Sequence, residues 1–271
     1  MIGNNFYNIG YDNPHFKQKK SGVNFEPEYI AILDRATALG YANPTFDQQI
    51  KQNTFLKNMK NNGSFALNDL ILVFANNGSK EFACINWKNP NGNLATIVNA
   101  PIFTPNEGFT GRGSFSPNFF NDYIATGYAP NGSLNYKLNN ASRYIYVRSL
   151  PSSRVLDGLT ANTANTITNQ PSSVNNRINQ GGSSLTTAVS LSGVGMKSIH
   201  RANSSEVSII NNSIVTTVLS NSTSVAVSEQ CILRSASSYG TQQISYYTMG
   251  ASLISQNNQI ETDFLTYLNS L

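Results

Sequence analysis

Two short runs, Val207-Ser-Ile-Ile210 and Ile214-Val-Thr-Thr-Val218, flank the triplet Asn211-Asn-Ser213. β-Branched residues dominate both runs, which favours strands, and the Asn and Ser residues between them favour a turn. The same arrangement recurs, with Asn, Gly and Ser in between, around the runs 142–148, 185–191, 225–227 and 244–247. Strands that recur about every 8–12 residues predict a mainly β protein, an antiparallel β-sandwich of the jelly-roll kind or a barrel.

The strand-rich region is expected to begin near residue 80. Ala83-Cys-Ile-Asn-Trp87 precedes Asn89-Pro-Asn-Gly92, whose composition is typical of a turn, and Leu94-Ala-Thr-Ile-Val98 follows. We therefore predict a strand on each side of this turn. Residues 158–184 are rich in Asn, Ser and Thr but contain single apolar residues, so we predict a contact surface there, formed by a long loop or by edge strands.

Helical patterns lie on both sides of this region. Pro27, between Glu26 and Glu28, suits the first turn of a helix. This helix would end at Gly40 and would place four apolar residues on one face: Tyr29, Ile32, Leu33 and Ala36.

A second helix is expected from Thr45, which has Gln48 three residues later in a capping-box spacing, to the stop signal at residues 61–63. The apolar run 65–74 fits either a short helical turn or the first buried strand. Helical spacing returns over residues 252–271. The chain then divides into an extended N-terminal docking arm (1–25), a helical segment packed on the sandwich (26–75), the β-sandwich (76–250) and a C-terminal helix (251–271).

The composition of the 271 residues excludes several classes of protein. Only 12% of residues are charged and the net charge is +4, too few and too scattered for a dedicated nucleic-acid binder. The chain contains 38 Asn, 32 Ser and 20 Thr, yet 39% hydrophobic residues can still form a core. No apolar stretch is long enough to span a membrane, and the N-terminus lacks the pattern of a secretory signal. Cys84 and Cys231 are expected to be buried, reduced thiols.

Groups that could perform catalysis are scarce, so we expect a protein that is not an enzyme and has no cofactor. His15 is in the arm, His200 is expected in a Ser-rich turn, and neither has a recognisable acidic partner. No metal-ligand spacing occurs, although Asp and Asn oxygens in loops leave a weak Ca²⁺ site open. A polysaccharide depolymerase is the least favoured alternative, with three candidate carboxylates: Glu107, Asp122 and Asp157.

Aromatic residues close to Asn-rich loops suggest a different chemistry. Proteins commonly hold carbohydrate by stacking an aromatic ring on the sugar beside amide or hydroxyl donors. Four residues fit this description and are candidate glycan contacts: Trp87, Tyr123, Tyr128 and Tyr136. For Trp87, a place in the core is the favoured alternative.

A set of motifs in a fixed order resembles virion and prophage proteins of Bacteroidetes phages, including the crAss-like phages. The set consists of Ala83-Cys-Ile-Asn-Trp-Lys-Asn-Pro90, Pro101 to Gly113, Tyr123-Ile-Ala-Thr-Gly-Tyr-Ala-Pro130 and Asn140-Ala-Ser-Arg-Tyr144, after two helices. The match covers roughly residues 25–150. It implies a concanavalin-A-like β-sandwich attached to a head fibre, capsid or tail, and it carries no catalytic signature.

This resemblance predicts a structural protein of the virion, as a head fibre, capsid decoration or tail component. Its partners would be other virion proteins, and copies of the chain would form a homotrimer. The arm would dock through four aromatic residues, Phe6, Tyr7, Tyr11 and Phe16, because an isolated extended arm has no other partner against which to bury their apolar surface. The alternative function is a receptor-binding module that recognises a host surface glycan.

Overall fold

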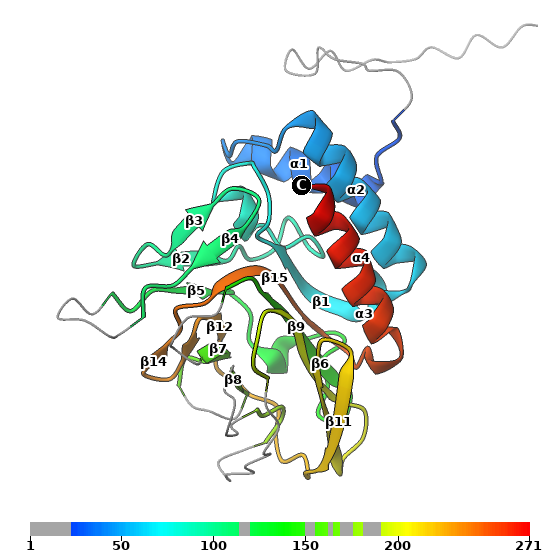
Figure 1. The fold of residues 1–271 in the computed structure, drawn as a ribbon, viewed down its shortest axis with the longest axis vertical. Coiled ribbons are helices and arrows are strands. Elements are labelled where there is room, and N and C mark those ends of the chain that lie inside the picture. Colours follow the sequence, from blue (N-terminus) through cyan, green and yellow to red (C-terminus); the bar gives the residue numbers. More distant parts are fainter. Residues whose placement is uncertain (1–22, 114–119, 150–154, 162–164, 169–175, 181–190) are drawn as a thin grey trace, which may run out of the picture.

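The computed structural model describes residues 23–113, 120–149, 155–161, 165–168, 176–180 and 191–271. Two antiparallel sheets face each other, and helices cover the outer face of the larger sheet (Figure 1). The predicted mainly β sandwich, with helices before it and a helix at its C-terminal end, is therefore confirmed.

The larger sheet has eight strands. Seven of them follow one another across the sheet in the order β11-β10-β9-β6-β15-β4-β3, and the eighth strand, β1, pairs with β15 beside β4. Their bounds are β1 Asn68–Val73, β3 Ile102–Thr104, β4 Gly108–Thr110, β6 Ala141–Val147, β9 Gly195–Arg201, β10 Glu206–Asn211, β11 Ile214–Leu219 and β15 Gln243–Gly250.

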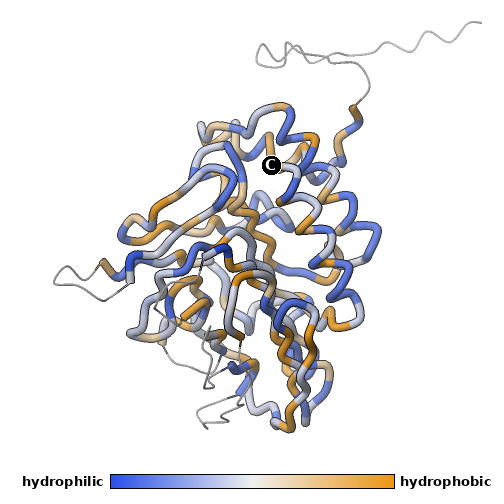
Figure 2. The backbone as a smooth tube through the Cα atoms, viewed as in Figure 1, coloured by the Kyte–Doolittle hydropathy of each residue, from blue (hydrophilic) through white to orange (hydrophobic). Residues whose placement is uncertain are grey.

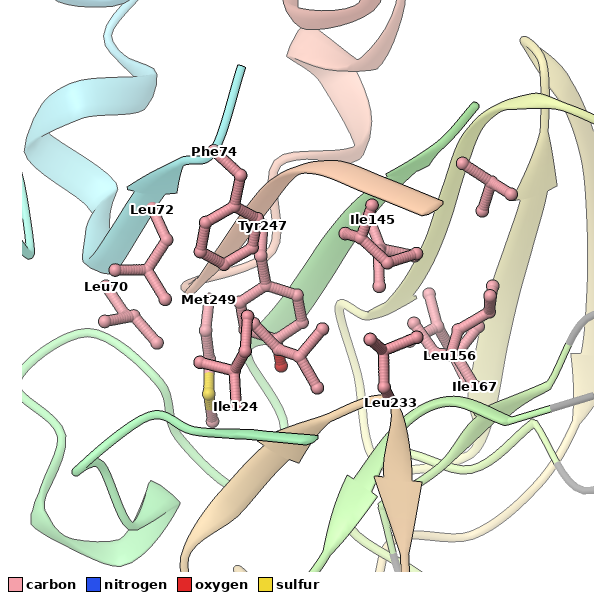
Figure 3. Packing of buried hydrophobic residues seen from close by; sticks show 14 of the residues in the cluster. Leu70, Leu72, Phe74, Ile124, Ile145, Leu156, Ile167, Leu233, Tyr247 and Met249 are labelled. Carbon is pink, nitrogen blue, oxygen red and sulfur yellow. The ribbon is translucent and has the colours of Figure 1, made fainter. Parts of the chain in front are cut away.

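The smaller sheet has five strands in the order β2-β5-β12-β7-β8. These are β2 Thr96–Val98, β5 Tyr123–Ala125, β7 Val155–Leu159, β8 Ile167–Thr168 and β12 Gln230–Ile232, and the pair β13 (Arg234–Ser235) and β14 (Ser238–Tyr239) follows β12. The sandwich core lies between the sheets, where Tyr247 and Met249 of the large sheet face Ile124 and Leu233 (Figure 3).

A second core joins the large sheet to the helices α1 (Pro27–Ala38), α2 (Phe46–Asn61) and α4 (Asn257–Ser270). The short elements α3 (Ser64–Leu67), η1 (Phe82–Cys84), η2 (Pro130–Gly132) and η3 (Ile254–Gln256) lie in the connections.

Strand β1 contributes side chains to both cores. Leu70 and Leu72 belong to the sandwich core, whereas Ile71 and Val73 belong to the helical core, because successive side chains of a strand point to opposite faces.

Several predicted elements are confirmed. Pro27 opens α1, and the predicted apolar face of that helix is buried. Thr45 caps α2, since its hydroxyl accepts a hydrogen bond from the Gln48 amide. Residues 65–74 contain both alternatives, a helical turn followed by a strand. Cys84 and Cys231 are free and buried.

Other predictions are wrong. Ala83–Trp87 is not a strand: it starts in the short helix η1, and its apolar side chains are buried by the helical layer and the sheet together. Residues 225–227 form no strand. His200 is not in a turn but is buried in β9. The segment 26–75 is not wholly helical, since β1 is part of the large sheet.

Two predictions concern residues outside the described part of the chain. These are residues 185–190 of one predicted strand and residues 1–22 of the arm.

Candidate binding pocket

A pocket of about 240 Å³ opens beside the turn at residues 89–92. Two loops form it, one before β2 and the other between β5 and η2. Polar residues predominate in its lining, which consists of Asp69, Leu70, Asn86, Asn89, Gly92, Asn93, Thr126, Gly127 and Tyr128. Three asparagine amides and one tyrosine ring thus share one small concave site.

The two loops are fixed to each other at the rim. The Asn93 side-chain amide donates a hydrogen bond of 2.9 Å to the Gly127 carbonyl, and this leaves the amide oxygen as an acceptor. The Gly127 N–H donates in turn to the Glu229 carboxylate at 2.6 Å. Gly127 has a φ of +68°, and a side chain there would meet the Leu94 carbonyl oxygen and the Asn93 Cβ at 3.0 and 3.1 Å. Only glycine combines this conformation with this close approach.

The floor of the pocket is held by backbone contacts. The Asn86 amide oxygen accepts hydrogen bonds from the N–H groups of Ile71 and Lys88, and its nitrogen donates to the Asp69 carbonyl. The Asp69 carboxylate accepts from the N–H groups of Asn135 and Tyr136. Because these two polar side chains serve the fold, the exposed Asn89 and Asn93 at the rim are the amides that a ligand meets first.

Tyr128 lines the pocket and packs against the sandwich core. Burial raises the pKa of its hydroxyl, so the group stays neutral at physiological pH. The hydroxyl oxygen itself is buried. Tyr128 is thus an aromatic residue among the polar residues that line the pocket.

The other three predicted glycan contacts do not line this pocket. Trp87 is 1% exposed in the helical core and Tyr136 is 1% exposed in the sandwich core, so neither ring is available at the surface. For Trp87, the core alternative is correct. Tyr123 is half-buried, and the Arg234 guanidinium lies 4.6 Å from the centre of its ring. The arm residues Phe6, Tyr7, Tyr11 and Phe16 lie outside the described residues.

The three candidate carboxylates have structural partners. The Glu107 carboxylate accepts a hydrogen bond from Gln243, and Asp122 forms an ion pair with Arg112 at 2.5 Å. Asp157 is fully buried and pairs with Arg143 at 2.6 Å. Burial raises the pKa of Asp157, an effect that Arg143, the Tyr247 hydroxyl and the Ile167 N–H oppose.

Two kinds of feature are absent from the described residues. No group of three or more His, Cys, Asp or Glu side chains there could hold a metal ion. No helix in the same residues has the length and apolar character needed to cross a bilayer.

Most of the pocket cannot be predicted from the sequence, because its residues come from three separate segments: strand β1, the loop before β2 and the loop after β5. Tyr128 is predicted as an aromatic residue near Asn-rich loops, and Asn89-Pro-Asn-Gly92 is predicted as a turn. Nothing in the sequence shows that residues 69 and 86 lie beneath that turn, because the tertiary fold alone brings them there.

The fold resembles several solved structures. The binding domain of botulinum neurotoxin DC in complex with rat synaptotagmin II matches with a TM-score of 0.50 at 11% identity, over 75% of this chain and 52% of that one. Trypanosoma rangeli sialidase in complex with sialic acid gives a TM-score of 0.42 at 12% identity, over 79% and 38% of the two chains. Domain 4 of AbnA, an arabinanase of Geobacillus stearothermophilus, in complex with arabinotriose, gives 0.37 at 10% identity, over 72% and 98%.

This chain thus spans about half of the neurotoxin chain and less of the sialidase. No protein-family model matches the sequence, and comparison with curated proteins finds no relative. At sequence identities this low, the similarity to these structures bears on the fold alone. The chain is similar in fold to the β-sandwich of a toxin binding domain.

Proposed function

We propose that the protein is a structural component of a bacteriophage virion, which attaches to the particle through its N-terminal region and displays a lectin-like β-sandwich. The observation that carries this proposal is where the arm meets the folded body. The described chain begins beside α1 and α2, where the Asn24 carbonyl accepts a hydrogen bond from Asn53. The helices cover one face of the large sheet and the sandwich core lies on the other. Attachment and display would therefore use different sides of the molecule.

The resemblance of the ordered motifs to those of phage virion proteins supports this setting. An experiment on particles tests it. A phage that encodes the chain without residues 1–24 should make soluble protein that does not enter particles, measured by immunoblotting of purified virions. A matched variant, Ile30→Ala, alters an exposed side chain of α1 and should be incorporated like the wild type. Normal incorporation of the truncated protein would contradict docking through the arm.

The pocket beside Tyr128 favours a second proposal, the recognition of a host surface glycan. Sugars present a ring face with C–H groups and an edge of hydroxyls, which suits an aromatic wall beside the amides of Asn89 and Asn93. The loss of one aromatic contact is worth about 0.5–1.5 kcal/mol, so Tyr128→Ala should weaken binding up to roughly tenfold.

The test is a glycan array with surface polysaccharides of the host, followed by calorimetry on any ligand found. Tyr128→Ala and Asn89→Ala should lose affinity, whereas Tyr123→Ala, a half-buried tyrosine outside the pocket, should keep it. If the protein bound none of the polysaccharides, the glycan proposal would be contradicted. If all three variants bound with equal affinity, this pocket would not be the glycan-binding site.

A further inference from the structure

Strand β11 forms an outer edge of the large sheet, and its residues carry no charge. It pairs with β10 on one side, and no described strand lies on its other side. Five of its six residues are exposed, and Val215 and Leu219 have 50% and 79% of their surface in contact with solvent. Coloured by residue hydropathy, the backbone shows apolar residues interspersed with polar ones along the β10–β11 hairpin (Figure 2).

Edges of this kind are normally protected. Natural sheets place charged side chains, proline or a bulge on an exposed edge, because unpaired N–H and C=O groups otherwise recruit another strand. β11 has the sequence Ile-Val-Thr-Thr-Val-Leu, with no charge and no proline, and its pairing with β10 runs over six consecutive residue pairs without a register shift. The edge is therefore open to a further strand.

The hairpin is held firmly in place. The Ser213 hydroxyl at its turn donates to Glu261 of α4 at 2.6 Å, and the Lys197 ammonium of β9 contacts the side chains of Asn211 and Asn212. An incoming strand thus meets an edge that is already ordered, which lowers the entropic cost of association.

The turn decides which backbone groups point outward. Asn212 and Ser213 both have positive φ, the conformation of a two-residue type I′ hairpin turn. Ile214 then bonds to Asn211 of β10, and every second residue of β11 does likewise, a series that Ser220 continues by donating to the Ser205 carbonyl. The residues between them, Val215, Thr217 and Leu219, direct their N–H and C=O groups away from β10.

The same three residues share a face of the sheet and are symmetric about Thr217. We propose that β11 pairs with β11 of a second copy in antiparallel fashion about a two-fold axis at Thr217. Thr217 then faces Thr217 of the second copy, and Val215 of each copy faces Leu219 of the other. All six outward N–H groups meet carbonyls, two exposed apolar pairs are covered, and no like charges meet. Such an interface is isologous and closed.

This inference does not depend on the proposed virion function, and it predicts a dimer in place of the trimer expected from the sequence. One edge strand buries less than the roughly 800 Å² per partner of a standard interface, so the dimer is weak in solution. It forms at high protein concentration, or where a particle holds copies side by side.

Sedimentation velocity over a wide range of protein concentration tests the proposal. The wild type should pass from monomer to dimer. Thr217→Lys, which places two ammonium groups face to face on the axis, should raise the dissociation constant at least about tenfold. Thr96→Lys, on the exposed edge strand β2 of the small sheet, is the matched control and should dimerise like the wild type. A wild type that stays monomeric or forms trimers, or a dimer unaffected by Thr217→Lys, would overturn the proposal.

A cysteine variant tests the register. Thr217→Cys should form a covalent dimer under mild oxidation, because directly opposed residues in a hydrogen-bonded pair have Cα atoms about 5.5 Å apart, within disulfide range. Thr216→Cys, which points to the other face and lies opposite Val218 of the second copy, should cross-link far less. The native Cys84 and Cys231 are buried, so they should contribute little cross-linking of their own. Equal cross-linking of both variants, or of neither, would overturn this register.

Discussion

Arg143 and Asp157 join the two sheets inside the sandwich. Both side chains are fully buried, and the pair is completed by the Tyr247 hydroxyl, which donates to the carboxylate at 2.9 Å. The other terminal nitrogen of the Arg143 guanidinium donates to the Arg177 carbonyl, so protein groups solvate the Arg143 charge. Each buried charge therefore has a partner inside the core, and the role of Asp157 is to neutralise Arg143 and join the two sheets.

Loss of the carboxylate should be costly. Asp157→Asn keeps the shape of the side chain but leaves the Arg143 charge buried without a counter-ion, so we expect a loss of about 3–5 kcal/mol in the free energy of unfolding. Tyr247→Phe removes one donor from the same carboxylate and should cost about 1.5–3 kcal/mol. Urea unfolding of both variants measures the difference, and wild-type stability of Asp157→Asn would contradict the role of the pair.

His200 gives the protein a pH dependence. Its ring is buried against Tyr144, with one nitrogen 3.0 Å from the Ser198 hydroxyl, and burial lowers its pKa to about 3. The unfolded chain binds a proton below the ordinary value of 6.5, whereas the folded chain does not until about 3. The free energy of unfolding should therefore fall as the pH drops through this window, by up to about 1.4 kcal/mol per pH unit.

Urea unfolding of the wild type and of His200→Gln from pH 7 to pH 4 measures this contribution. Carboxylates titrate in both proteins, so the difference between the two slopes isolates His200. Parallel slopes would show that this residue does not titrate differently in the folded and unfolded states.

At the scale of elements, a polar network fastens the helices to the sheet. The Tyr267 hydroxyl of α4 accepts hydrogen bonds from Gln48 and Gln52 of α2 and donates to the Ala75 carbonyl that follows β1. The Tyr29 hydroxyl of α1 donates to the Gln52 amide oxygen at 2.6 Å. Three helices and the end of strand β1 therefore meet at two buried side chains, Tyr267 and Gln52.

Tyr267→Phe tests this network without a change of shape. It leaves the Gln52 amide and the Ala75 carbonyl with unmet hydrogen bonds, which should cost about 1–3 kcal/mol. Tyr146→Phe is a suitable control, because Tyr146 is half-buried against the same core. Thermal unfolding compares the two variants, and equal midpoints would argue against the network.

The elements also show what the sequence could predict. Strand-forming runs separated by Asn, Gly and Ser identify β6, β10 and β11, and capping and apolar spacing identify α1 and α2, because these signals are local. β9 is not predicted because Lys197, His200 and Arg201 are polar residue types, although all three are buried. Lys197 and Arg201 donate to Asn212 and to the Ser220 carbonyl, and the Tyr144 ring packs against His200, contacts that only the tertiary structure provides. The pocket cannot be predicted for the same reason. Tyr128 and the turn at 89–92 are each predicted from the sequence, but their proximity depends on the tertiary structure.

On the scale of the whole molecule, one sheet serves two cores. The large sheet packs against the small sheet on one face and against three helices on the other. The described chain begins beside the helices, the candidate pocket lies at the loops before β2 and after β5, and β11 forms an edge of the large sheet. The three proposals therefore concern different residues of the molecule.

A mass-spectrometric inventory of purified particles, combined with a low-resolution map that locates the protein, tests whether it is a virion component. A virion component should be present in a fixed number of copies per particle, in density attached to the head, a fibre or the tail. Its absence from purified particles, with abundant protein left in the lysate, would contradict the claim.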